Sequence, residues 1–159
     1  MPERRVAVVG CGNVLMRDDG VGVRVVERLR ERGVPEGVEL IDAGTALMDV
    51  LPFLGGVDKT ILVDAARAGG EPGAVYRLPL AALEEAARRS SVRAVSLHDV
   101  ELREALTLAR LENVDLGEVV VLGMEPGPIE TGMELSEPVE RAVPRLIEAI
   151  RTEIEKTKE

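Results

Sequence analysis

The feature that most constrains the fold is a set of short apolar runs separated by longer, more polar stretches. Four such runs, rich in Val, Ile and Leu, occupy residues 6–9, 38–41, 60–63 and 118–124. The run at residues 6–9 is uninterrupted, which is typical of a strand buried on both faces and therefore of a parallel sheet. An alternating run at residues 75–78 predicts a further strand at the edge of the sheet.

The stretches between these runs carry helical periodicity. The expected helices are one ending at Gly33, a short one capped by Thr45, one reaching about Arg89, one beginning at Ser96 and one capped by Ser136. Pro144 lies inside the last of these, where we predict a kink or a break. The charged tail from about Glu153 is expected to fray.

Strands that alternate with helices in this way predict an α/β fold. We expect a three-layer sandwich, with a largely parallel (mixed) central sheet of about five strands and helices on both faces. A chain of 159 residues has the size of one domain. We therefore predict a single domain over residues 1–159, with an ordered core over about residues 4–152.

The composition argues against several classes of function. The chain has 20 Lys and Arg against 29 Asp and Glu, a net charge of −9, and its only aromatic residues are Phe53 and Tyr76. Nucleic-acid binding needs a basic face and often aromatic stacking, so we expect no nucleic-acid partner. No apolar run suits a signal peptide or a membrane span, which predicts a cytoplasmic protein without a membrane partner. The single cysteine, Cys11, fits a reducing compartment, and the lack of a heptad pattern predicts a monomer.

Polar side chains follow the predicted strands at the positions where each strand ends. In open α/β sheets, ligands bind beyond the carboxyl ends of the strands. The residues that this rule selects are Asn13, Asp18, Asp19, Asp42, Asp64 and Glu125, and His98 lies near a helix start that could face the same edge.

The segment Gly10-Cys11-Gly12-Asn13 begins like a dinucleotide-binding fingerprint. That fingerprint needs a third small residue where Leu15 stands, and a helix whose N-terminus meets the pyrophosphate. Asp18 and Asp19 would instead place two negative charges where phosphate would lie. Asp42, the candidate ribose-binding acid, follows Gly12 by about thirty residues instead of the usual ~20. A nucleotide-binding oxidoreductase is therefore the weaker alternative.

Asp19, Asp64 and His98 form the more informative set. Two carboxylates and an imidazole are a common set of ligands for a divalent transition metal with open coordination positions. A 2-1-3 strand order would bring the loop with Asp19 beside the end of the strand with Asp64. The first turn of a helix disfavours a protonated His98, and a neutral imidazole is the form that binds metal.

The same residues also have structural explanations. Asp18 or Asp19 would also serve as a cap of the first helix, Asp64 as a turn residue, and a lone histidine is often a surface residue. Cys11 has only His98 as a possible imidazole partner, and no nucleophile elbow occurs in the sequence. A small buried residue at a strand end is the better interpretation of Cys11. A hydrolase built on this chain would therefore use metal-assisted or carboxylate-assisted attack by water.

At these residues the sequence resembles a known family. The opening pattern Gly10-x-Gly12-Asn13-x-Leu15-x-x-Asp18-Asp19-Gly20-x-Gly22 is similar to that of the hydrogenase maturation endopeptidases. Further segments agree in order: Asp42-Ala43-Gly44-Thr45, Asp64, Glu71-Pro72-Gly73, Ser96-x-His98, Gly123-x-Glu125-Pro126, and Gly132 followed by Leu135-Ser136. The resemblance extends from about Val6 to Ile150.

The resemblance implies a protease that removes a C-terminal extension from the large-subunit precursor of nickel–iron hydrogenase after nickel insertion. The family's metal-binding positions fall here on Asp19, Asp64 and His98, and either Asp19 or Asp42 is a candidate general base. The nickel would belong to the precursor, with cadmium or zinc as substitutes in crystals. Many members of the family have Glu at the position of Asp19. They more commonly have glycine at the position of Ala43, and alanine restricts the backbone there more than glycine would. A non-catalytic nickel-recognition or chaperone module is the main alternative.

Overall fold

The computed structural model of the protein describes residues 3–82 and 99–159, which contain one mixed sheet of five strands. The strands are β1 (Val6–Cys11), β2 (Val38–Gly44), β3 (Lys59–Ala65), β4 (Val75–Pro79) and β5 (Glu118–Met124). They lie in the order β2-β1-β3-β5-β4, and only the edge strand β4 is antiparallel to its neighbour. The predicted α/β fold and the 2-1-3 order are confirmed.

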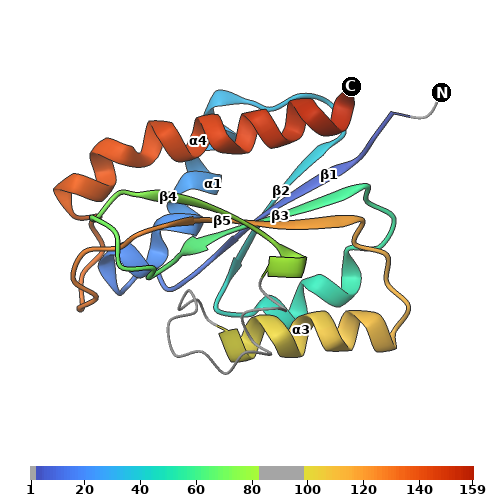
Figure 1. Ribbon diagram of the computed structural model, residues 1–159, viewed down its shortest axis with the longest axis horizontal. Helices are drawn as coiled ribbons and strands as arrows, with labels where there is room; N and C mark the ends of the chain where they lie inside the picture. The colour runs from blue at the N-terminus through green and yellow to red at the C-terminus, as the bar shows by residue number, and fades with distance from the viewer. Residues whose placement is uncertain (1–2, 83–98) are drawn as a thin grey trace.

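Helical segments cover both faces of this sheet (Figure 1). One face carries α1 (Val21–Arg32) and α4 (Glu137–Lys158), and the other carries α3 (Asp99–Leu111) with the 3₁₀ turns η2 (Leu47–Asp49) and η3 (Leu51–Phe53). A further 3₁₀ turn, η1 (Arg17–Gly20), leads directly into α1. The three-layer arrangement is the one that the sequence predicts.

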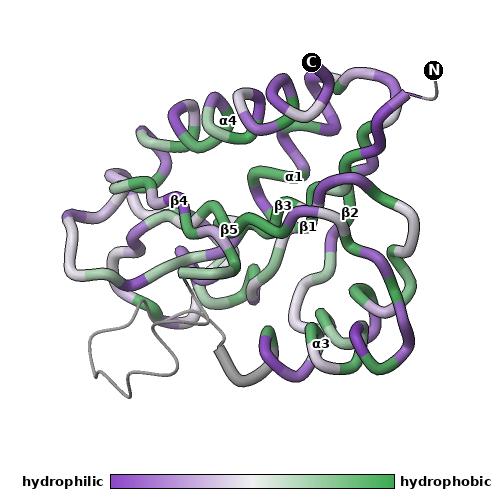
Figure 2. Tube along the Cα trace, turned by 45° about the vertical axis from the view of Figure 1, so that its right-hand side comes forward, coloured by the Kyte–Doolittle hydropathy of each residue, from purple (hydrophilic) through white to green (hydrophobic). Residues whose placement is uncertain are grey.

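The core consists of two apolar clusters, one on each face of the sheet. Val8 belongs to the cluster under α1 and α4, whereas the next residue, Val9, belongs to the cluster under α3. This alternation follows from the period of two in a β-strand, and it explains why the central strands read as continuous apolar runs. Figure 2 shows these hydrophobic residues gathered along the central strands. Cys11 is buried at the end of β1, as predicted.

Three local expectations are wrong, wholly or in part. Thr45 does not cap a helix, because two short 3₁₀ turns follow it, and Ala46 is the residue before the first. Pro144 does not break the last helix, since α4 runs unbroken from Glu137 to Lys158. Ser136 does precede α4 but makes no side-chain capping bond. The buried apolar stripe of α4 holds the helix on the sheet on both sides of Pro144, which offsets the missing backbone hydrogen bond.

The tail that we expected to fray is helical to Lys158. Glu153 is buried there, and its carboxylate contacts Lys59 Nζ at 2.8 Å and Arg77 Nε at 3.0 Å. Lys158 Nζ donates to the carbonyl of Glu36 at 2.6 Å and ties the end of the helix to the opposite loop. These contacts join the C-terminal helix to the amino end of β3. No local sequence pattern predicts them, because the partners are far apart in the sequence.

The helix expected to reach about Arg89 is described only over residues 80–82, and its remainder lies outside the described residues. The same holds for the Ser96–His98 helix start, although α3 follows directly at Asp99. Within residues 3–82 and 99–159, no helix has the length and apolarity that crossing a bilayer requires.

Candidate active site at the carboxyl edge of the sheet

The glycine-rich turn after β1 is a packing device. Gly22, at the start of α1, lies against the carbonyls of Val63 and Cys11, so a Cβ there would overlap the backbone of β3. Gly12 has a φ of 123°, and a Cβ at Gly12 would overlap the carbonyl oxygen of Asp19. The glycines therefore let η1 and α1 approach β1 and β3 closely, which explains the pattern without a bound pyrophosphate.

Asp19 is positioned by this turn. It lies in η1, is half-buried, and its Oδ2 accepts a hydrogen bond of 2.9 Å from the backbone N–H of Asn13. The residue preceding α1 is Gly20, and no side chain makes a capping bond there. The capping explanation of Asp18 and Asp19 is therefore wrong, and Asp19 is held facing the end of β1 instead.

Asp64 reaches the same place from β3, the strand beside β1. Its side chain is buried, with a relative exposure of 6%, and its Oδ1 accepts a 2.8 Å hydrogen bond from the N–H of Ala65. The same Oδ1 lies 3.5 Å from the position that a Cβ of Gly12 would occupy, and the backbone of Asp19 contacts that position too. The structure thus brings Asp64 and the Asp19 turn together around Gly12.

Asp42 lies on the other side of β1. It is exposed near the end of β2, in register with Gly10, which pairs in turn with Val63 of β3. Two strand spacings, roughly 10 Å, therefore separate the backbone at Asp42 from that of β3. Asp42 and Asp64 flank the end of β1 from opposite sides.

His98 lies outside the described residues, so the convergence of Asp19, Asp64 and His98 stays a prediction. Among the residues that are described, no three His, Cys, Asp or Glu side chains are grouped so that they could hold a metal ion. The two predicted carboxylate ligands do lie at one edge of the sheet, as the strand order requires.

Asp18 has a structural role that the sequence did not reveal. Its side chain is fully buried. The carboxylate accepts hydrogen bonds from the N–H of Gly127 at 2.8 Å, the N–H of Ser136 at 2.7 Å and the Ser136 hydroxyl at 2.6 Å. Asp18 thereby fixes the loop after β5 to the turn that carries Asp19. Because Ser136 is 118 residues away in sequence, no spacing pattern could have indicated the pair.

Glu125, also selected as a strand-end residue, braces the loop that follows Asp64. Its Oε1 accepts hydrogen bonds from the N–H groups of Ala68 at 2.8 Å and Gly70 at 3.0 Å, and from the Tyr76 hydroxyl at 2.7 Å. Burial by itself would raise the pKa of Glu125, but these donors outweigh it and lower the pKa below its usual value. Burial and the neighbouring carboxylate raise the pKa of Tyr76. An ionised Glu125 is therefore built into the structure as an acceptor.

The fold and its acidic strand ends are those of an open α/β protein, a class in which ligands bind beyond the carboxyl ends of the strands. The family described as HycI, hydrogenase maturation protease, matches residues 23–153. The hydrogenase expression/formation protein HupD of Bradyrhizobium diazoefficiens is 34% identical over 139 residues, covering 86% of this chain and 71% of that protein.

Solved structures agree with this assignment. The hydrogenase maturating endopeptidase HybD from E. coli has a TM-score of 0.81 and 28% identity, covering 96% of this chain and 93% of HybD. A hydrogenase 2 maturation peptidase from a Thaumarchaeota archaeon has a TM-score of 0.67 and 30% identity, covering 95% and 98% of the two chains. The chain belongs to the hydrogenase maturation protease family and is a hydrolase of the peptidase class.

Proposed function

We propose that this protein removes the C-terminal extension of a nickel–iron hydrogenase large-subunit precursor after nickel has been inserted. The nickel carried by the precursor would serve as the recognition element. The observation that supports the proposal most strongly is the meeting of Asp64 with the Asp19 turn around Gly12, in a chain that belongs to this peptidase family. The proposed setting is the cytoplasm, where the protein would act as a monomer.

Asp19, Asp64 and His98 are the proposed ligands of the precursor's nickel. Carboxylate oxygen and imidazole nitrogen are both suitable donors for a divalent transition metal. The Asn13 N–H on Asp19 and the Ala65 N–H on Asp64 fix the orientation of the two carboxylates before the substrate binds. Hydrogen bonds of this kind to ligating groups contribute substantially to metal affinity.

The proposed reaction is hydrolysis of a peptide bond held beside these carboxylates. Water adds to the scissile carbonyl carbon, one carboxylate accepts the proton of the water, and the departing amine then takes that proton as the C–N bond breaks. Asp19 and Asp42 are the two candidate bases, because Asp19 is bound by the N–H of Asn13 just after β1 and Asp42 is in register with Gly10 near the end of the same strand. The substrate's nickel would hold the peptide in place, and positioning alone supplies a large part of such a rate enhancement.

This arrangement would act as a checkpoint in maturation. A precursor without nickel would lack the interactions with Asp19, Asp64 and His98, so it would have no differential affinity for the site. Cleavage would then follow only after the metal has been loaded.

The test is incubation of the purified protein with nickel-loaded and nickel-free precursor, followed by mass spectrometry of the precursor. We expect loss of the C-terminal extension from the loaded form only. Asp64→Asn and His98→Ala should abolish the mass loss and retain the melting temperature, whereas Asp49→Asn, an exposed acid in η2, should process normally.

Two outcomes would contradict the proposal. A stable complex with loaded precursor and no mass loss would indicate the non-catalytic chaperone. Full processing by Asp64→Asn or His98→Ala would remove these residues from the ligand set. Asp42→Asn separates the candidate bases, because it should reduce kcat without weakening precursor binding only if Asp42 accepts the proton.

A further inference from the structure

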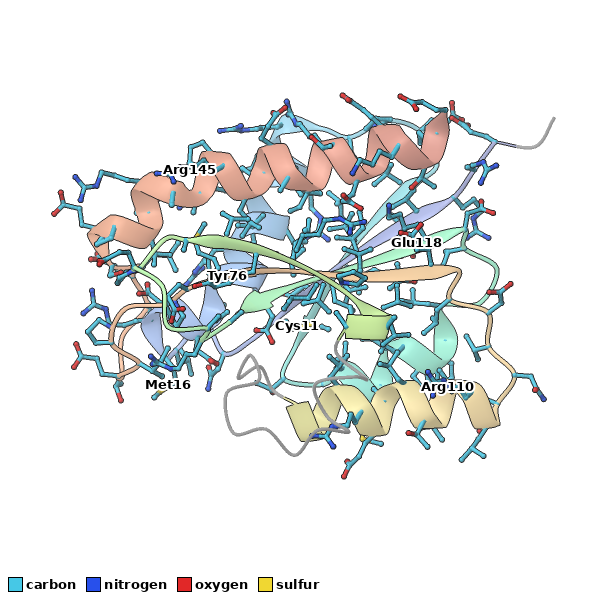
Figure 3. The ribbon with its side chains drawn as sticks, in the orientation of Figure 1. Cys11, Met16, Tyr76, Arg110, Glu118 and Arg145 are labelled. Atoms are coloured by element: carbon cyan, nitrogen blue, oxygen red, sulfur yellow. The ribbon has the colours of Figure 1, made fainter. Side chains whose placement is uncertain are left out.

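Two exposed apolar residues lie on adjoining loops beside the candidate active site. Leu15 is 55% exposed and Met133 is 62% exposed. Their loops pair through the backbone, since the N–H of Gly132 donates to Leu15 O at 2.9 Å and the N–H of Arg17 donates to Gly132 O at 2.8 Å. In Figure 3, Met16 marks this position, at the end of the sheet away from Glu118. We name residues 13–17 and 127–135 the Leu15–Met133 rim.

The rim is held rigidly by side chains from η1 and α1. Asp18 fixes both ends of the second loop through Gly127 and Ser136, as described above. Arg17 donates to the carbonyl of Glu134 at 3.3 Å and forms an ion pair of 3.0 Å with Glu130. Arg24 donates to the carbonyl of Met133 at 3.0 Å.

The backbone of Arg17 also has a φ of 48°, a conformation that non-glycine residues adopt at an energetic cost. The clamping contacts hold this strained backbone in place, and with it the backbone that carries Leu15 and Met133. Such an arrangement favours docking of another molecule, because little conformational freedom is lost when the surface becomes covered.

A groove of about 720 Å³ adjoins Met133 between α1 and the start of α4. The lining of the groove consists of two apolar residues, three arginines and five glutamates: Met133, Leu135, Arg17, Arg24, Arg28, Glu27, Glu31, Glu134, Glu137 and Glu140. All three arginines already form ion pairs, Arg17 with Glu130, Arg24 with Glu27 and Arg28 with Glu140. Glu137 is also paired with Arg141 at 3.7 Å, but five glutamates against three arginines in the lining leave the groove acidic, and it is therefore complementary to a basic group.

We infer that the Leu15–Met133 rim and this groove dock the protein substrate next to the segment that is cleaved. The partner is a stretch of the precursor with an apolar side chain that covers Leu15 and Met133 and a neighbouring Lys or Arg that enters the groove. Leu15 lies two residues after Asn13, whose N–H binds the Asp19 carboxylate, so the rim adjoins the position at which a polypeptide would meet Asp19. The inference rests on the proposed function for the identity of the partner.

The experiment measures both precursor binding and processing for charge-introducing variants. Leu15→Lys and Met133→Lys should each raise KM and the Kd for nickel-loaded precursor by about tenfold, because a charge replaces an apolar contact and repels the basic group of the partner. The kcat should change less than about twofold, since neither side chain touches the reacting atoms. Leu111→Lys is the matched control: Leu111 is 76% exposed at the end of α3, before the amino end of β5, and its variant should match the wild type.

The groove is tested separately through its charge. Glu134→Lys should raise KM several-fold, and the effect should shrink at high salt because it is electrostatic. Glu148→Lys, an exposed acid on α4 outside the groove, should have little effect.

The outcomes separate this inference from the proposed function. Wild-type KM and Kd in Leu15→Lys and Met133→Lys, with unchanged melting temperatures, would overturn the docking surface even if processing occurs. Wild-type protein that binds the precursor without cleaving it would refute the proposed reaction, while weakened binding of the same variants would still support the docking surface. No binding of the precursor by the wild type would overturn both.

Discussion

Replacement of Glu153 by Gln is expected to lower the free energy of unfolding by about 3 kcal/mol at neutral pH. The side chain of Glu153 is only 3% exposed, and it bridges two cations from the sheet. Its Oε1 lies 2.8 Å from Lys59 Nζ, and its two oxygens accept hydrogen bonds of 3.0 and 3.1 Å from Arg77. Lys59 is itself buried, so the substitution leaves a buried cation without this charged partner.

The magnitude follows from the pKa of the carboxyl group. Burial alone would raise the pKa of Glu153, but the hydrogen bonds and charges of Arg77 and Lys59 outweigh burial and lower it from 4.5 to about 2. Each pKa unit corresponds to about 1.4 kcal/mol, which gives the total of about 3 kcal/mol. Because the pKa is lower in the folded state, this stabilisation is fully present above about pH 4.5 and is lost as the pH falls toward 2.

Thermal and urea unfolding at a series of pH values measure this effect. At pH 7 the melting temperature of Glu153→Gln should lie about 6–12 °C below that of the wild type. The difference in unfolding free energy between the two proteins should narrow progressively below about pH 4.5. Glu148→Gln, an exposed position on the same helix, should unfold like the wild type throughout. Equal melting temperatures at pH 7, or a difference that does not change between pH 7 and pH 3, would refute the reasoning.

Two further predictions concern the active-site edge. Gly12→Ala should destabilise the protein by about 3 kcal/mol and stop precursor processing, because the new Cβ would displace the Asp19 turn. Gly33→Ala also places alanine at a positive φ, but in open space, and should cost only about 1 kcal/mol in a urea titration with processing intact. Tyr76→Phe removes one donor from Glu125 and should lower stability by about 1 kcal/mol and reduce kcat through the loop after Asp64. Unaltered kcat in Tyr76→Phe would show that the brace does not influence the site.

Local patterns in the sequence are sufficient to predict most of the fold and part of the candidate site. The strands could be predicted because Val8 and Val9 are buried on opposite faces, which makes a central parallel strand continuously apolar. The proximity of the Asp19 turn to Asp64 could also be predicted. In open α/β sheets the residues at the carboxyl ends of neighbouring parallel strands form the ligand site, and a 2-1-3 strand order makes the strands that precede these two residues neighbours. The role of Glu153 could not be predicted, because a glutamate in a charged C-terminal segment is typical of a solvated tail. Its partners Lys59 and Arg77 are distant in sequence and come beside it only in the folded chain.

The pair Asp18 and Asp19 shows why residue type alone cannot assign a role. Both acids follow the first strand, and either one would suit a cap, a ligand or a structural acceptor. They occupy one turn of 3₁₀ helix, in which successive side chains diverge by about 120°. One carboxylate is therefore directed into the protein, where it holds the loop that ends at Ser136, and the next is held by the N–H of Asn13 at the edge of the sheet. The same short turn thus couples the proposed docking rim to the proposed ligand, because a displacement of Asp18 would move the backbone of Asp19 with it.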